Sequence, residues 1–302
     1  MKKFILYTAS ILFVVFLSAC EDVIQLDIPD KGETKLVVDA WITNIHDDKR
    51  VKLSLSQPYF DTAEPSPASG ATVILFESDS TAHEFVESGT SGEYWLKRED
   101  TGFLRKQGQY ALYIKYQGSE YASLSAMKRV PQIDSINYEF FEFPIAPDDQ
   151  PKEGYLAQFY SRDISGEGDS YWIRTTKNGQ YINDPAQIST AYDAGFSPNS
   201  KSDGLLFIQP IRQSINDGLY LHGDSIKVEV WSITNEAFYF LNQVRQQSSN
   251  GGIFATPSAN VITNIVPLNE NAGMQAVGFF GVSQVSEMQT VVDSTKAVKS
   301  AD

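Results

Sequence analysis

The chain has 302 residues, 42% of them apolar, and a formal net charge of −14 at pH 7. Such an acidic surface repels phosphate backbones, which excludes nucleic acid as an expected partner. Cys20 is the single cysteine, so the chain can form no internal disulfide and no zinc site with several thiolates. The length allows sizeable cores, and we expect two domains because one core rarely serves more than about 250 to 300 residues.

Residues 1–19 are expected to form a lipoprotein signal peptide. Two lysines precede an apolar run over residues 4–17, and small residues follow that run. This order is typical of an export signal, and the run is too short to predict a membrane-spanning helix. Residues 17–20, "LSAC", resemble the bacterial lipobox, in which the cysteine is acylated and becomes the first residue of the mature protein.

Cys20 is therefore the predicted lipid attachment site. Several acyl chains on one residue bury enough methylene groups, at about 0.8 kcal/mol each, to hold a protein on a bilayer. The alternative is an ordinary export signal in which the cysteine has no such role. Residues 20–34 are acidic and punctuated by proline and glycine, so we expect them to form a tether.

Residues 35–128 are predicted to form an N-terminal β-sandwich. Apolar and polar side chains alternate in residues 51–56, "VKLSLS", and in residues 110–116, "YALYIKY". Other short segments rich in β-branched or aromatic residues lie between them, each bounded by turn-forming residues. Several short strands without a helical period are typical of a sandwich.

A C-terminal β-rich domain is expected over residues 129–290, after a linker that contains Pro131. Asn178 and Gly179 favour a tight hairpin, because both residue types tolerate positive φ angles. Residues 183–204 show no periodicity and are predicted to form a long polar loop.

One helix is predicted, over residues 235–248. Thr234 is a suitable N-cap, and Glu236 lies in the first turn, where an acidic side chain interacts favourably with the helix dipole. An apolar stripe with helical spacing is formed by Ala237, Phe240, Leu241 and Val244. We expect this stripe to pack on the second sheet, with a partner-binding helix as the alternative. Residues 291–302 are expected to form a flexible tail.

An acidic turn in the second domain is a candidate calcium site. Its alternating oxygen-bearing residues are Asp163, Ser165, Glu167 and Asp169. Calcium-binding loops use this spacing because a tight, glycine-containing turn directs alternate oxygen atoms inward. The pattern lacks the downstream glutamate of an EF-hand, and a polar turn between two strands is the alternative. No other cofactor is predicted.

No catalytic residue is predicted. His46, His83 and His222 are far apart in the sequence and show no metal-ligand spacing. The chain has no nucleophile elbow, no phosphate-binding loop and no dinucleotide fingerprint. The carboxylate pair of a glycosidase leaves no sequence signature, so a glycan-active hydrolase stays open as an alternative.

Segments along most of the mature chain carry a family resemblance. Among them are "CEDVIQLDIP" (20–29), "KLVVDAWITN" (35–44), "VKLSLSQPYF" (51–60), "RDISGEGDSYWIR" (162–174) and "EAFYFLNQVRQQ" (236–247). They resemble Bacteroidetes outer-membrane lipoproteins of unknown function, which are typically encoded beside TonB-dependent transporters. None of the segments is a catalytic signature, so the resemblance assigns no active-site residue.

The expected fold and location follow from separate features. Chain length, strand pattern and helix signals predict a mainly β chain of two β-sandwich domains, the second with one packed α-helix. Residues 69–116 resemble the transthyretin-like and carboxypeptidase-regulatory sandwiches, which are Ig-like. Acids directly after the lipid-bearing cysteine, here Glu21 and Asp22, resemble a surface-export signal of lipoproteins in this phylum, which implies display on the cell exterior.

The resulting hypothesis is a lipid-anchored, non-catalytic binding or accessory subunit of a TonB-dependent nutrient uptake system. Its expected partners are the membrane, through the lipid, and the transporter, with a peptide or glycan as cargo. Tyr192 and Phe196 are the predicted ligand contacts, and Tyr59 and Phe60 are either further contacts or core residues. A surface adhesion or structural module is the alternative function.

Overall fold

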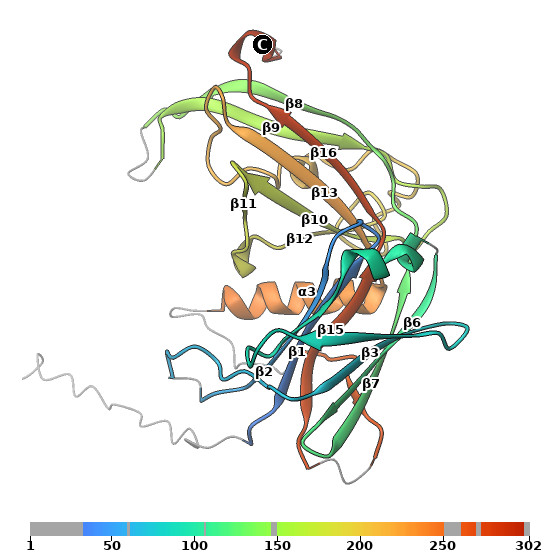
Figure 1. Ribbon diagram of the computed structural model, residues 1–302. Helices are drawn as coiled ribbons and strands as arrows, with labels where there is room; N and C mark the ends of the chain where they lie inside the picture. The colour runs from blue at the N-terminus through green and yellow to red at the C-terminus, as the bar shows by residue number, and fades with distance from the viewer. Residues whose placement is uncertain are drawn as a thin grey trace, which may run out of the picture. The chain divides into compact units, whose positions relative to one another are not determined.

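Strands dominate the chain, as the alternation in its sequence predicts (Figure 1). The computed structural model describes residues 33–58, 61–105, 107–145, 150–250, 261–269 and 273–298. Within these ranges the fold is mainly β, with two large sheets, a separate two-stranded ribbon and few helices. No helix in these ranges has both the length and the apolar character needed to cross a membrane.

The larger sheet has nine strands. In spatial order they are β14 (Val266–Pro267), β7 (Ser119–Met127), β6 (Gly108–Tyr116), β3 (Thr72–Glu77), β4 (Ala82–Glu87), β5 (Glu93–Leu96), β2 (Lys49–Leu55), β1 (Leu36–Thr43) and β15 (Ala276–Ser283). Neighbouring strands are antiparallel, except that β1 and β15 run parallel. Short 3₁₀ turns at Arg98–Asp100 and Gly102–Arg105 connect β5 to β6.

The larger sheet curls until β15, at one end, meets β7, near the other. The N–H of Val282 on β15 donates a 3.0 Å hydrogen bond to the hydroxyl of Ser125 on β7. The Asn264 side chain donates to the carbonyl oxygens of Leu124 and Phe280, at 3.4 and 2.8 Å. These bridges make the sheet nearly closed, so its inward-facing side chains enclose one core.

Alternating side chains fill this core, as predicted for residues 110–116. The buried set on β6 is Tyr110, Leu112, Ile114 and Tyr116. The corresponding set on β1 is Leu36, Val38, Ala40 and Ile42. Because successive side chains of a strand point to opposite sides, Trp41 lies on the outer face of the larger sheet.

The smaller sheet has five strands. β11 (Gln180–Tyr181), β10 (Ser170–Lys177), β13 (Ser225–Ile233) and β16 (Val285–Val291) lie in this order, and β12 (Ser189–Tyr192) pairs with β10. The two-stranded ribbon consists of β8 (Ile133–Glu142) and β9 (Glu153–Ser161). Ribbon side chains such as Ile136 and Phe159 share a core with Tyr171 and Val228 of the sheet. The ribbon therefore covers one face of the smaller sheet (Figure 1).

The predicted hairpin and loop of the second half have different outcomes. The hairpin is confirmed, since Asn178 and Gly179 have φ angles of 52° and 79° between β10 and β11. The loop over residues 183–204 is wrong in part, because it contains a 3₁₀ turn at Pro185–Gln187 and strand β12. Pairing with β10 stabilises this short strand, and such tertiary pairing overrides a weak local preference.

Other short helical segments are α2 (Gln209–Arg212) and a 3₁₀ turn at Ser294–Lys296.

The two sheets do not divide the chain at residue 128. β14 and β15 lie within residues 129–290, yet they pair with β7 and β1 of the first range. Only Gln284 separates β15 from β16, so the chain passes directly from the larger sheet into the smaller one. Accordingly, Glu33–Asp302 form one compact unit.

The predicted helix is confirmed as α3 (Asn235–Ser248). The Thr234 hydroxyl accepts a 3.2 Å hydrogen bond from the N–H of Ala237, as expected of an N-cap. The apolar face of the helix packs against Trp172 of the smaller sheet and Phe279 of β15. α3 therefore lies where the two sheets meet.

β15 lies directly against β1 at Gly278, and this contact can be tested. Gly278 has a φ angle of +98°, and an added Cβ would overlap the carbonyl oxygen of Val38. We expect Gly278→Ala to lower the free energy of unfolding by about 1 to 3 kcal/mol or more, because β1 must shift and the backbone is strained. Urea unfolding measures the change.

Gly223→Ala is the matched control for that experiment. Gly223 has a φ angle of +93°, but no atom lies within 4 Å of an added Cβ. Gly223→Ala should lower the free energy of unfolding less than Gly278→Ala does, since it adds backbone strain but no steric overlap. Equal losses would show that the approach of the two strands at Gly278 is not a constraint.

Candidate functional site

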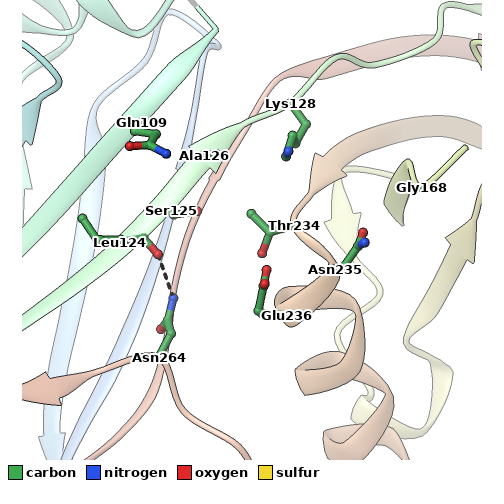
Figure 2. A pocket seen from close by; sticks show the side chains of 10 residues that line it. All are labelled: Gln109, Leu124, Ser125, Ala126, Lys128, Gly168, Thr234, Asn235, Glu236 and Asn264. Atoms are coloured by element: carbon green, nitrogen blue, oxygen red, sulfur yellow. Dashed lines mark hydrogen bonds between the residues drawn. The ribbon is translucent and has the colours of Figure 1, made fainter. Parts of the chain in front are cut away.

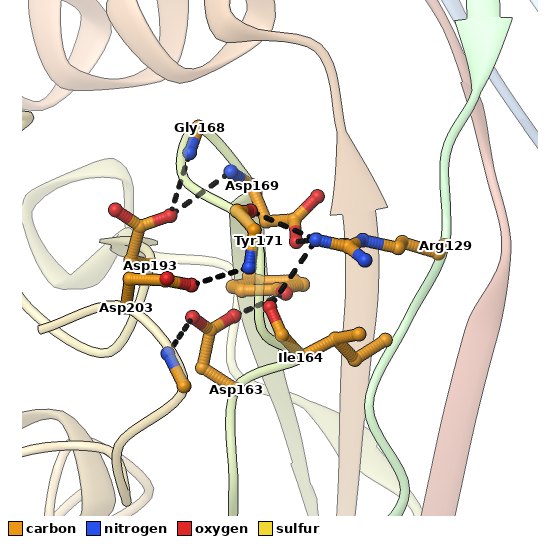
Figure 3. Close-up of polar contacts among 10 residues, drawn as sticks. Arg129, Asp163, Ile164, Gly168, Asp169, Tyr171, Asp193 and Asp203 are labelled. Atoms are coloured by element: carbon orange, nitrogen blue, oxygen red, sulfur yellow. Dashed lines mark hydrogen bonds and ion pairs between the residues drawn. The ribbon is translucent and has the colours of Figure 1, made fainter.

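Three aspartate side chains converge beside the acidic turn of the second half (Figure 3). Asp163 follows the end of β9, Asp193 follows β12, and Asp203 lies ten residues further on. One carboxylate oxygen of each lies within 4.8 Å of those of the other two. Asp163 and Asp193 are each only 3% exposed, so this aspartate cluster is largely removed from water.

Backbone N–H groups of the turn point at these carboxylates. Asp193 accepts hydrogen bonds from the N–H groups of Gly168 and Asp169, at 2.9 and 3.0 Å, and Asp203 accepts one from Gly166 at 2.8 Å. Gly166 and Gly168 have φ angles of 120° and 101°, a region that favours glycine. The two glycines thus allow the turn to present its N–H groups to the carboxylates (Figure 3).

Asp163 is held by two further donors. The Tyr171 hydroxyl donates at 2.6 Å to one oxygen, and the N–H of Gly204 donates at 2.9 Å to the other. Burial raises the pKa of Asp163, these hydrogen bonds oppose the rise, and the charges of Asp193 and Asp169 add to it. Burial also raises the pKa of Tyr171, which keeps its hydroxyl a neutral donor at physiological pH.

No lysine or arginine in the described parts of the chain forms an ion pair with the aspartate cluster. The nearby Arg129 instead pairs with Asp169, at 2.6 Å, and donates to the carbonyl oxygens of Ile164 and Gly166. Buried carboxylates are usually paired or bound to a metal. Asp163, Asp193 and Asp203 are therefore the residues that could hold a hard divalent cation such as calcium.

The predicted calcium ligands are distributed differently. Of Asp163, Ser165, Glu167 and Asp169, only Asp163 belongs to the aspartate cluster. Ser165 and Glu167 are exposed, and Asp169 is paired with Arg129. The turn directs its N–H groups, and not alternate side-chain oxygens, toward the interior. The oxygens that join Asp163 in the cluster therefore come from Asp193 and Asp203. Calcium binding itself stays a prediction.

A cavity of about 350 Å³ lies beside the same turn (Figure 2). Gly168 lines it together with Lys128, which follows β7, and with Asn235 and Glu236 at the start of α3. The lining carries one cation and one anion, Lys128 and Glu236, so it has no marked preference for ligands of either charge.

A second cavity, the aromatic cleft, lies among β1, β15, the smaller sheet and α3 and measures about 440 Å³. Its aromatic walls are Trp41, Trp172, Tyr181, Phe240 and Phe279. The Trp41 ring meets Trp172 edge to face at 5.0 Å and stacks on Phe279 at 5.5 Å. An apolar cavity of this size with a few polar groups is typical of a small-molecule site.

Gly281 lets Trp41 form this wall. Trp41 and Gly281 are partners in the parallel pairing of β1 with β15. A Cβ at residue 281 would overlap the indole ring. The glycine therefore allows the ring to lie against the backbone of β15.

The predicted ligand contacts lie elsewhere. Tyr192 is half-buried, its ring contacts Phe238 at 5.7 Å, and its hydroxyl accepts a 3.4 Å hydrogen bond from Asn235. Phe196 is 52% exposed. Neither residue lines the aromatic cleft. Outside the described residues lie Cys20, Glu21, Asp22, Tyr59 and Phe60.

Sequence reasoning missed the aromatic cleft and two members of the aspartate cluster. Trp41 carried a usable signal, because alternation along residues 35–44 places it opposite the apolar core positions. Asp193 and Asp203 carried none, since they lie in a polar segment whose approach to Asp163 depends on tertiary structure.

These features define a class of protein: a β-rich chain in which two sheets and one long helix meet at an aromatic cleft. The chain belongs to the family described as a domain of unknown function (DUF4249), whose model matches residues 21–289. A search of the curated proteins found no match. Membership of a family of unknown function is thus confirmed, and the function has to be argued from the molecule.

The raised pKa of Asp163 predicts a pH dependence of stability. The folded protein binds this proton more tightly than the unfolded chain, whose aspartates have the ordinary pKa of 3.8. Protonation of Asp163 therefore makes its full contribution to the free energy of unfolding below the pKa of the unfolded chain. This contribution is lost as the pH rises through the raised pKa of the folded protein. Between about pH 4 and 7, the free energy of unfolding of the wild type should fall relative to that of Asp163→Asn. Urea unfolding at several pH values measures this difference. The expectation would be contradicted if the free energies of unfolding of the wild type and of Asp163→Asn changed in parallel with pH.

Proposed function

We propose that the protein is a lipid-anchored, non-catalytic binding subunit of a TonB-dependent uptake system, displayed on the outer face of the outer membrane. The aromatic cleft is the observation that carries the binding role. Its volume of about 440 Å³ suits a small ligand or one unit of a larger cargo. Its walls come from both sheets and from α3, so the cleft is held by well-packed elements.

The position of the family match supports the lipid anchor. The match begins at residue 21, directly after Cys20. Cleavage before Cys20 would therefore leave the whole matched segment attached to the acylated cysteine. Residues 21–35 separate the cysteine from β1, which is enough chain to hold the folded unit clear of a bilayer surface.

The sequence resemblance supports the link to a transporter. Lipoproteins that this chain resembles are typically encoded beside TonB-dependent transporters, and Glu21 and Asp22 resemble their surface-export signal. A binding subunit displayed beside the transporter on the cell surface would collect a ligand from the exterior and present it to the transporter.

The anchor can be tested by changing Cys20. In fractionated cells, we expect the wild type in the outer-membrane pellet and Cys20→Ala to be lost from it, because a chain without acyl groups lacks the lipid that would hold it on that bilayer. The double variant Glu21→Ala, Asp22→Ala should stay in the pellet but be less accessible to protease added to whole cells. Retention of Cys20→Ala in the outer-membrane pellet would disprove the anchor.

The transporter role can be tested by affinity purification from intact outer membranes. The wild type should be recovered together with a TonB-dependent transporter. Trp41→Ala should keep that partner, since the change affects only the cleft, and circular dichroism can verify its fold. Recovery of the lipoprotein alone would overturn the accessory role.

A further inference from the structure

We propose that the aromatic cleft binds ligands that join an apolar ring to a carboxylate, and that Arg174 is the partner of the carboxylate. This inference rests on the proposed binding role and names the chemical class of its ligand.

The apolar part of the ligand is defined by the rings of the cleft. Trp41, on the outer face of the larger sheet, and Trp172, on the smaller sheet, meet at a centroid distance of 5.0 Å. Phe240 and Phe279 lie 4.8 Å apart on the same wall. Aromatic faces and edges attract flat rings in offset or edge-to-face contacts, so a planar apolar group fits best.

Arg174 does not itself line this cleft, but its guanidinium lies against two of the rings that do. Its guanidinium carbon is 4.9 Å from the ring of Trp172 and 4.1 Å from that of Tyr181, and both rings line the cleft. A third ring, Trp231, lies 4.2 Å away. The guanidinium is thus held among three aromatic side chains, which fixes its plane before any ligand arrives.

The donors of Arg174 have no acceptor in the described structure. No hydrogen bond or ion pair joins its guanidinium to any described residue, and its Nε is buried without a partner. A buried donor without an acceptor is energetically unfavourable. Stacking on aromatic rings occupies the faces of a guanidinium and leaves its edge, with the N–H groups, available.

Arg212 shows that stacking does not by itself leave an arginine unpaired. Its guanidinium also lies over a tyrosine ring, that of Tyr160, at 4.9 Å. Arg212 nevertheless donates to the carbonyl oxygen of Phe207 at 2.7 Å and to the Gln158 side chain at 3.3 and 3.4 Å. The unpaired state of Arg174 is therefore a local property of its site.

The acid across the strand from Arg174 and the acids of the cleft are engaged elsewhere. Glu229 is its cross-strand partner on β13, but Glu229 pairs with Lys227 at 2.9 Å. Asp184, which lines the cleft, accepts a hydrogen bond from the N–H of Ala186 at the start of a 3₁₀ turn. Asp39, which also lines the cleft, lies 3.9 Å from Arg50. None of these three acids forms an ion pair with the Arg174 guanidinium.

A carboxylate is the expected anion because its two oxygens match two parallel N–H groups of a guanidinium. The net charge of −14 repels highly charged anions at long range. A ligand with one negative charge and a large apolar part avoids most of this repulsion, and it satisfies both parts of the site.

A matched pair of probes tests the inference: 2-naphthylacetate and its uncharged amide, 2-naphthylacetamide. Isothermal titration is performed on the purified full-length chain, with titrations into protein-free micelles subtracted. The wild type should bind the acid about tenfold or more tightly than the amide, since a hydrogen bond to a charged group contributes about 1.5 to 3 kcal/mol. Arg174→Met should bind the two probes with equal affinity, close to that of the wild type for the amide.

Three further variants separate the parts of the site. Arg174→Lys keeps the charge without the planar fork and should retain only part of the preference for the acid. Lys115→Met removes an equal charge from an exposed ion pair with Glu120, away from the residues that line the cleft, and should leave the preference unchanged. Trp41→Ala should weaken the binding of both probes.

The outcomes distinguish this inference from the transporter role. Equal binding of acid and amide by the wild type, no binding of either, or an unchanged preference in a folded Arg174→Met variant would each overturn it. Failure of the protein to co-purify with a transporter would leave the probe measurements unaffected, and a failed probe experiment would leave the membrane partner in place.

Discussion

The parallel pairing of β1 with β15 is the contact on which the rest of the structure depends. It brings β15 against β7, so that the larger sheet nearly closes, and it leads the chain directly into β16 of the smaller sheet. It also places Trp41 beside Gly281 on the outer face. The cleft exists because this outer face, the smaller sheet and α3 meet there.

Local features of this fold could be predicted from the sequence, and long-range pairing could not. α3 was predictable because its cap and its apolar period lie within one short segment, and β6 because its side chains alternate cleanly. The pairing of β1 with β15 was not predictable, since any apolar strand offers the same backbone hydrogen bonds. The expected division at residue 128 therefore misses the return of β14 and β15 to the larger sheet.

The candidate sites show the same limit at the level of single side chains. The sequence pattern points to the acidic turn, but the positive-φ glycines of the turn direct N–H groups at carboxylates that come from residues 193 and 203. Asp193 and Asp203 thus supply the negative charge that the sequence pattern assigns to the turn itself. The role of Arg174 could not be predicted either, because an arginine can be identified as unpaired only when its neighbours in space are known.

The place of β1 has a mechanical consequence for a protein held at its N-terminus. β1 is flanked by β2 on one side and by β15 on the other. A pull along β1 from its N-terminal end would load its hydrogen bonds to both neighbours together, in shear, and not one after another as in unzipping. If the chain is tethered through Cys20 as proposed, drag from a flowing medium would reach the anchor through these two sets of hydrogen bonds, loaded in shear.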